Sequence, residues 1–424
     1  MTLFTAVAIP IGLAAQDQEE HNTKQLHYSV TDLGTLKGGN FSCAMGLNNQ
    51  GWTEVMDTLG DESSGNMLLR ARATISGVKI DLGTLGGPNS WINWGGINEP
   101  GAAVGYAETS APDPNGEDYW SFGAHLTCRP FLWQDGRMTA LPTLGGNNGQ
   151  ASAINRRGQV TGEAENTTPD STCTAPQVFQ SLPVLWEAGQ IHELATVSGD
   201  PDGFAFGIND LGQAAGYSGT CIASLHAVLW ENGAAVELPN LGSLSNNVAY
   251  AINNQGQVVG NSSPNDTTFY AVLWQNGVVT NLGTIPGDFA SFATGINNKG
   301  QVVGSSLDAN FNLVHAFLWE KGVMTDLSTL FPAGFYLYPT MANEINSVGQ
   351  ISGMATVVSG PDAGDIHAFL ATPVDPSTAT ADATLATPGG TSQAPKVILP
   401  DNVRKLVRQS LGFGRFGAGS IKPQ

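Results

Sequence analysis

The sequence predicts an all-β fold, a seven-bladed β-propeller, and three observations support this. A phrase of short apolar strands and turns repeats along the chain, and its most regular copies lie 44 residues apart, from Asn209 to Asn253 and from Asn253 to Asn297. Units of about 40–50 residues with several short strands are typical of propeller blades. Nothing within the units has the 3.6-residue period of an amphipathic helix, so we expect few helices there.

The repeat occurs seven times, which sets the number of blades. Each copy contains an Asn followed three residues later by a Gly, and we interpret these Asn as structural positions of the repeat: Asn48, Asn98, Asn155, Asn209, Asn253, Asn297 and Asn346. Five copies also carry a Leu-Trp strand, with Trp133, Trp186, Trp230, Trp274 and Trp319. Packing between blades is the simplest interpretation of these Trp, and stacking platforms for a sugar are the alternative.

Each unit reads as four strands joined by tight turns. In one copy, residues 293–296 and 301–304 flank the turn 297–300, and residues 317–319 and 323–327 flank the turn 320–322. Asn-Gly pairs such as Asn276-Gly277 are hairpin signals because both residues accept positive φ. We place the strand before the repeated Asn innermost, since it carries the smallest side chains and the axis of a propeller is crowded.

The two ends of the repeat region complement each other. The chain enters on an outermost-type strand, residues 28–36, and leaves on a third-type strand, residues 367–370. Pairing of the N-terminal strand with the C-terminal blade completes the seventh blade. This pairing closes the ring and removes exposed strand edges.

The domain organisation follows from composition. Residues 1–15 are predicted to be a signal peptide, because a short apolar run ends in small residues. No Lys or Arg precedes the run, so the signal is incomplete if the true start lies upstream of Met1. Residues 16–26 form a polar leader, 27–372 the propeller, 373–399 a disordered Thr/Ala/Pro-rich linker, and 400–424 a basic tail with a short amphipathic helix. We expect an extracellular or periplasmic protein.

Charge limits the range of partners. The net charge is −19, which repels nucleic acid and anionic membranes and tolerates cations. The apolar run near the N-terminus is too short to span a bilayer, so we expect no transmembrane segment. We predict a monomer whose partner is an unknown extracellular protein or glycan.

Four cysteines are present, Cys43, Cys128, Cys173 and Cys221. An even number in an exported protein permits disulfides. Cys128 with Cys173, or Cys173 with Cys221, would join neighbouring loops, and the sequence does not choose between them. Their spacing matches no sequence pattern of a zinc site.

The longest insertions, residues 107–128, 163–182 and 331–340, are interpreted as inter-blade loops, and loops on rigid scaffolds commonly carry function. The first contains the acidic and aromatic residues that suit a cation or a sugar, and they are our candidate ligand-binding residues: Asp113, Glu117, Asp118, Tyr119 and Trp120. A solvated loop is the alternative.

A second candidate is a metal site at Asp200 and Asp202, in a stretch similar to part of a Ca²⁺ loop. It lacks the third carboxylate and the terminal Glu of a complete loop, so a tight turn is the alternative. Apart from Ca²⁺ at this stretch, we expect no cofactor. His226, His315 and His367 recur at one repeat position, which favours a structural role. No catalytic motif occurs in the sequence, and we name no catalytic residue.

The run from His315 to Trp319, together with Asp326-Leu327 and the phrase from Gly295 to Gly304, resembles the HAF-repeat family, described as extracellular bacterial proteins. The likeness covers about residues 28–370. Arg70-Ala71-Arg72-Ala73-Thr74 departs from it, so we expect the first blade to be irregular. Membership implies export and a repeat fold, with no established activity. A weaker likeness to regulator-of-chromosome-condensation repeats supports seven blades by analogy.

These observations predict an exported, non-catalytic binding or surface-interaction module. One alternative is a propeller enzyme acting on an extracellular polysaccharide, and another is a structural envelope protein. Carboxylates converging in one deep pocket, alone or with His125 or His192, would favour the enzyme.

Overall fold

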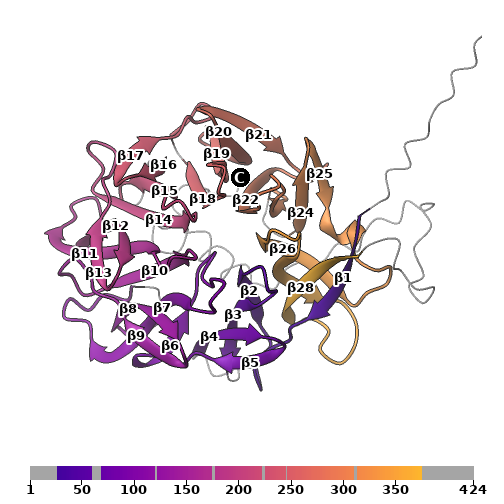
Figure 1. Cartoon of the computed structure of the whole chain (residues 1–424), viewed down its shortest axis with the longest axis horizontal. Coiled ribbons are helices and arrows are strands. Elements are labelled where there is room, and N and C mark those ends of the chain that lie inside the picture. Colours follow the sequence, from indigo (N-terminus) through magenta and orange to yellow (C-terminus); the bar gives the residue numbers. More distant parts are fainter. Residues whose placement is uncertain are drawn as a thin grey trace, which may run out of the picture.

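Seven four-stranded antiparallel sheets form a closed ring in the computed structural model of the chain (Figure 1). The structure describes residues 26–59, 68–119, 122–173, 177–221, 225–244, 246–309 and 313–374. The predicted signal peptide, the basic tail and nearly all of the polar leader and linker lie outside these residues. The predicted seven-bladed propeller is confirmed.

Each blade contributes one sheet, with its strands ordered from the axis outward. Inner strands such as β18 and β22 surround the centre, and outer strands such as β17 and β21 lie at the rim (Figure 1). The first three blades are β2 (Ser42–Leu47), β3 (Thr53–Leu59), β4 (Leu68–Ile75) and β5 (Val78–Asp81); β6 (Gly86–Trp91), β7 (Ala103–Pro112), β8 (Leu126–Gln134) and β9 (Arg137–Ala140); β10 (Gly149–Ile154), β11 (Val160–Pro169), β12 (Phe179–Glu187) and β13 (Gln190–Glu193).

The remaining blades follow the same order. They are β14 (Asp202–Ile208), β15 (Ala214–Gly219), β16 (Leu225–Glu231) and β17 (Ala234–Glu237); β18 (Val248–Ile252), β19 (Val258–Asn265), β20 (Thr268–Gln275) and β21 (Val278–Gly283); β22 (Ala290–Ile296), β23 (Val302–Leu307), β24 (Val314–Glu320) and β25 (Val323–Asp326); and β26 (Leu337–Ile345), β27 (Ile351–Val357) and β28 (Ile366–Val374) with β1 (His27–Asp32). A short 3₁₀ helix, η2 (Leu327–Leu330), follows β25.

The seventh blade closes the ring as predicted. The N-terminal strand β1 is its outermost strand and pairs antiparallel with β28, with Val30 opposite Ala371 and Asp32 opposite Phe369. The indigo and yellow ends of the described chain therefore lie side by side (Figure 1). Because the two ends of the repeat region are joined, opening the ring requires breaking a whole strand pair.

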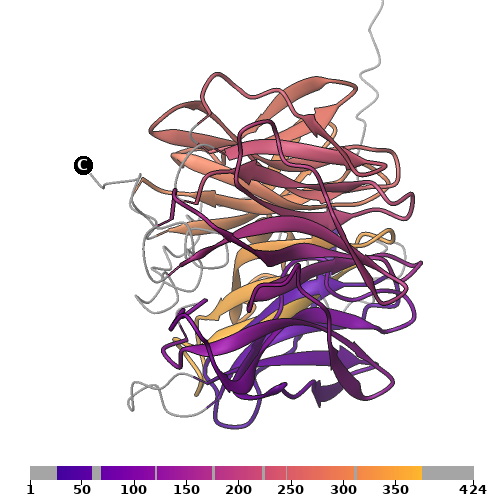
Figure 2. The ribbon, with the colours of Figure 1, turned by 90° about the vertical axis from the view of Figure 1, so that its left-hand side faces the viewer.

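The strands run roughly along the ring axis, so the connections gather at two opposite ends (Figure 2). Turns between first and second strands share one end, which we call the turn end; connections between second and third strands and between blades share the other, the loop end. Residues 107–128 and 163–182 prove to be connections within blades, between β7 and β8 and between β11 and β12. The inter-blade interpretation was wrong for these two because each insertion joins the second and third strands of a single sheet.

The axis is filled differently from the expectation. Small residues of the inner strands, such as Ala205, are fully buried, but large side chains of these strands and of the segment after β6 also lie at the axis. Trp94 of the second blade lies 5.9 Å from Phe206 of the fourth and 5.2 Å from Tyr250 of the fifth, measured between ring centroids. Since the second blade is not adjacent to the fourth or fifth, these rings meet across the centre. They form an aromatic plug that our argument from crowding did not foresee.

The first blade is regular, contrary to expectation. Its third strand β4 pairs with β3 without a register shift, from Thr53–Thr74 to Leu59–Leu68. Arg72 occupies a position that is apolar in other blades, such as Val272. Its guanidinium is fully buried 2.6 Å from the Asp57 carboxylate. Because this partner compensates the buried charge, an Arg fits where an apolar residue is usual.

Candidate ligand site

A ring of seven Asn side chains surrounds the axis at the turn end. The side-chain amide of each repeated Asn donates to the backbone carbonyl of its counterpart in the next blade, at 3.0–3.2 Å, and the last, Asn346, donates to Asn48. The circle of hydrogen bonds is therefore complete. It fixes the spacing of the seven blades around the opening.

The same Asn also organises its own turn. In the fifth blade, the side-chain oxygen of Asn253 accepts from the backbone amides of Gln255 and Gln257, both at 3.0 Å. Gly256 adopts a φ of 72°, which favours glycine. One side chain thus satisfies backbone groups of two blades, which explains why the repeat needs Asn here.

We expect Asn253→Ala to destabilise the protein by about 2–3 kcal/mol, because backbone groups of two blades would lose their hydrogen bonds to this side chain. Chemical denaturation measures this. Asn254→Ala, in the same turn but with an exposed side chain, is the control and should cost less than about 1 kcal/mol. Equal effects of the two changes would contradict the structural role of the ring.

The Asn ring frames a pocket of about 210 Å³ at the axis. Outside the ring, the residues that follow each Asn form a polar rim: Asn49, Glu99, Arg156, Asp210, Asn254, Asn298 and Ser347. The aliphatic residues that precede each Asn also line the pocket, and all of them except Ile208 are buried: Leu47, Ile97, Ile154, Ile208, Ile252, Ile296 and Ile345. Every blade contributes to both layers, and we call the pocket the axial funnel.

The rim carries three charges that offset each other in part. The Arg156 guanidinium lies 3.4 Å from a carboxylate oxygen of Glu99 and 3.8 Å from one of Asp210. The Asp210 carboxylate also accepts from the backbone amide of Arg156 and from the side chain of Asn254. The rim therefore has an excess of one negative charge.

Among the residues that the structure describes, Glu344 is the one ionisable residue that lines the funnel inside the rim. It lies two residues before its repeated Asn, a position that is Gly or Ala in the six other copies: Gly46, Gly96, Ala153, Gly207, Ala251 and Gly295. The side chain is partly exposed and lines the funnel. Burial raises the pKa of Glu344 from 4.5 to about 8, because no cation compensates its ionised form.

The predicted ligand residues of the first long loop are mostly buried. Asp113 and Glu117 each accept from the side-chain amide of Asn148, at 3.0 and 2.9 Å, and the Tyr119 hydroxyl donates to Glu163 at 2.8 Å. These bonds fasten the second blade to the third. Their groups are 2–8% exposed and offer little surface to a ligand.

Asp118 and Trp120 are the other two candidate ligand residues of this loop. Asp118 is partly exposed and accepts from the backbone amide of Gly123, and Trp120 lies outside the described residues. Ligand binding at this loop, by Asp113, Glu117, Asp118, Tyr119 and Trp120, stays a prediction.

The predicted metal pair is divided between two environments. The Asp200 carboxylate is 2.7 Å from Nδ1 of His226 and accepts from the Ser218 hydroxyl at 2.6 Å. Asp202 is fully buried and lies beside Asp170 and two cysteines. A Ca²⁺ site shared by Asp200 and Asp202 stays a prediction, and the contacts of Asp200 are those of a structural pair with His226.

The recurring His each contact an Asp. Nδ1 of His315 is 2.9 Å from Asp288, and Nδ1 of His367 is 2.9 Å from Asp32. These hydrogen bonds raise the pKa of both imidazoles. His125 contacts the Gly116 carbonyl and His192 is exposed on β13, and neither lines the funnel.

The repeated Trp lie between blades rather than on a binding surface. Trp186, Trp230 and Trp274 are 1–2% exposed. Their indole nitrogens donate to the carbonyls of Pro142, Ala195 and Pro239, in the segments leading to their own blades. Trp133 is also buried and Trp319 is partly exposed. The buried rings leave no face open to a sugar.

Of the two cysteine pairings left open by the sequence, the structure contains Cys173–Cys221. Cys43 and Cys128 are free and buried. The disulfide joins the β11–β12 loop of the third blade to the β15–β16 loop of the fourth.

Comparison with known proteins shows no family: no family model and no curated protein matches the chain. Solved structures similar to it include a Mycobacterium tuberculosis puromycin-hydrolyzing peptidase (TM-score 0.48, 10% identity, 83% of this chain and 55% of that chain) and the Pyrococcus horikoshii acylaminoacyl peptidase (0.46, 9%, 81% and 53%). The chain spans about half the length of these peptidases. Within the described residues, no helix is long and apolar enough to cross a membrane.

The sequence contained a signal for the funnel that we did not use. The repeated Asn was recognised as structural, but Glu344 in a column of Gly and Ala was not singled out. A charged residue that breaks a small-residue position of a repeat marks the place where one blade differs chemically from the others.

Proposed function

We propose that this chain is an exported, non-catalytic binding module, and that the axial funnel takes an alkylammonium group. The resemblance to HAF repeats and the disulfide support export, since disulfides persist in oxidising compartments. Glu344, the one carboxylate inside the funnel, carries the proposal. An ammonium ion beside it would supply the positive charge that this buried acid lacks.

The shape of the funnel fits the end of a chain rather than a bulky molecule. Its 210 Å³ corresponds to about seven water molecules, below the range of about 300–1,000 Å³ typical for whole small-molecule ligands. The aliphatic residues that line the funnel are mostly buried, so the Asn ring, the rim and Glu344 offer mainly polar groups to a ligand. A lysine side chain of a partner protein and a free polyamine share this chemistry.

A binding role fits better than catalysis. The rim hydroxyl of Ser347 is hydrogen-bonded to Asn49, and the described residues lining the funnel include no His. One carboxylate without a base or nucleophile beside it lacks the groups that acid–base or covalent catalysis requires. The described residues that line the funnel therefore support neither the enzyme nor the envelope alternative.

Calorimetry with cadaverine and with N-acetyl-lysine methylamide tests the proposal. Because an ammonium ion pairs with ionised Glu344, affinity should rise by up to about tenfold per pH unit from pH 6 to pH 8. Glu344→Gln should weaken binding at pH 8 and abolish this pH dependence. Exposed Glu193→Gln is the matched control and should bind like the wild type.

The outcomes separate the sources of the ligand. Preference for the lysine derivative indicates a protein partner, and preference for cadaverine indicates a polyamine. Binding of 1-pentanol as strong as that of the amines, or equal binding by wild type and Glu344→Gln, would refute recognition of a cation. No binding of any amine between pH 6 and pH 8 would refute the assignment of the site.

A further inference from the structure

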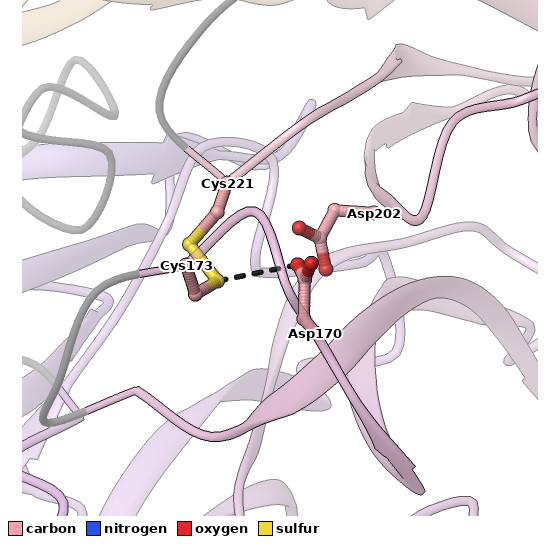
Figure 3. Close-up of side chains that lie close together, drawn as sticks. All are labelled: Asp170, Cys173, Asp202 and Cys221. Atoms are coloured by element: carbon pink, nitrogen blue, oxygen red, sulfur yellow. Dashed lines mark hydrogen bonds between the residues drawn. A yellow bond between two sulfur atoms is a disulfide. The ribbon is translucent and has the colours of Figure 1, made fainter.

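A second cluster of chemically active side chains lies at the loop end, remote from the funnel. It contains Asp170, directly after β11, Asp202, the first residue of β14, and the disulfide Cys173–Cys221. Figure 3 shows both carboxylates beside the two sulfurs. One ligand atom from each of the four residues lies within 4.8 Å of the others. Residues from two blades and three separate segments thus converge on one point.

The two carboxylates are held in position by backbone groups. One oxygen of Asp170 accepts from the backbone amide and hydroxyl of Thr172, at 2.7 and 2.8 Å. Its second oxygen lies 3.2 Å from Sγ of Cys173. Asp202 accepts from the backbone amide of Ser181 at 2.8 Å. Such supporting hydrogen bonds orient ligands in metal sites.

The contact between Asp170 and the disulfide has no evident purpose in the oxidised protein. A disulfide sulfur carries no proton, so it cannot donate to the carboxylate oxygen 3.2 Å away. A thiolate and a carboxylate sharing a bound cation would explain the same arrangement. Asp170 and Asp202 are 7% and 0% exposed and Cys221 is also buried, whereas Cys173 is partly exposed, so the cluster is largely buried and reaches solvent at Cys173.

We propose that reduction of the Cys173–Cys221 disulfide turns this cluster into a four-ligand site for Zn²⁺, with two sulfur and two oxygen donors. A dithiol reductant supplies two electrons and two protons and is itself oxidised to a disulfide; a phosphine supplies two electrons and becomes a phosphine oxide, while water supplies the two protons and the oxygen. Either reductant converts the protein disulfide to two thiols. The metal then displaces the two thiol protons and forms two metal–sulfur and two metal–oxygen bonds.

The geometry suits a tetrahedral ion. Zinc–sulfur bonds of about 2.3 Å and zinc–oxygen bonds of about 2.0–2.2 Å place ligand atoms about 3.4–3.8 Å apart, inside the 4.8 Å limit of the cluster. The bond between the two sulfurs must be broken before they can reach this spacing. Calcium fits less well, because it takes about six to eight oxygen ligands and two carboxylates supply at most four.

Such a site would keep the two loops joined in either redox state. The disulfide joins the third and fourth blades under oxidising conditions, and the metal would join the same residues under reducing ones. This site differs from the zinc patterns sought in the sequence because its ligands come from distant segments.

Metal titration of the full chain tests the proposal. After reduction with a phosphine, the protein should bind one Zn²⁺ more per chain than in its oxidised form, and Zn²⁺ should raise the melting temperature of the reduced form only. Substituting Co²⁺ should produce thiolate-to-metal charge-transfer absorption and intense tetrahedral d–d bands. Cys43 and Cys128 are free thiols in both the oxidised and the reduced protein, so any metal that they bind cancels in the comparison.

Variants separate this site from adventitious binding. Asp202→Asn should weaken Zn²⁺ binding to the reduced form at least tenfold, whereas Asp200→Asn, outside the cluster, should leave it unchanged. A Cys173→Ser/Cys221→Ser double variant should lose the additional Zn²⁺. Reduced wild type that binds no more metal than this double variant, or shows no thermal shift with Zn²⁺, would overturn the proposal.

Discussion

Replacing Asp57 by Ala is expected to destabilise the protein by about 3–5 kcal/mol, because it leaves the fully buried Arg72 guanidinium without its counter-ion. The remaining contacts of Arg72, to the Thr74 hydroxyl at 2.7 Å and the Gly34 carbonyl at 3.0 Å, satisfy hydrogens and do not neutralise the charge. Against a typical total of about 5–15 kcal/mol, this is a large loss. Chemical denaturation measures it directly.

A second change distinguishes loss of the ion pair from a general loss of packing. Asp57→Ala with Arg72→Val should recover much of the stability, since Val272 occupies the equivalent position of the fifth blade and no charge is then buried. The pair Arg70–Asp81, at 3.7 Å, with Arg70 partly exposed and Asp81 exposed, is the matched control. Asp81→Ala should cost less than about 1 kcal/mol. A double variant no more stable than Asp57→Ala would contradict this account.

Replacing Glu54 by Val is expected to stabilise the protein, and increasingly so as the pH rises. Glu54 is fully buried between the first and second blades, and neither carboxylate oxygen has a hydrogen-bond partner among the described residues. Burial raises its pKa well above 4.5. The equivalent residues of the fifth and sixth blades are Val259 and Val303, so Val is known to fit this position of the repeat.

The direction of the pH dependence follows from proton binding. Between pH 4.5 and the raised pKa of Glu54, the folded chain holds a proton that the unfolded chain has released. Stability therefore falls as the pH rises through this interval. The difference in unfolding free energy between Glu54→Val and wild type should grow by up to about 1.4 kcal/mol per pH unit.

Urea denaturation at several values from pH 5 to pH 8 measures this difference. Glu344 titrates in both proteins, so its contribution cancels in the comparison. A difference that is constant across the range would show that Glu54 does not titrate as its burial requires.

The fold was largely predictable because its determinants are local and repeated. A turn built on Asn253 and Gly256 depends on residues within five positions of each other, and seven copies of that turn specify seven blades. The pairing of β1 with β28 was also predictable, since the first and last partial units complement each other. In contrast, the regular first blade could not be foreseen, because Arg72 depends on a carboxylate 15 residues away.

The candidate sites depend on contacts between distant segments, which spacing does not reveal. The funnel exists because seven turns meet around one axis. Glu344 adds a carboxylate to its lining at a position where the six other blades have only Gly or Ala. The cluster of Asp170, Cys173, Asp202 and Cys221 joins two blades through residues up to 51 positions apart. By itself, the sequence determined the blade, the number of blades and the closure of the ring, through local hydrogen bonding and strand pattern. Only the tertiary structure decided which charged side chains are buried and which of them meet, because burial and proximity arise when the blades pack.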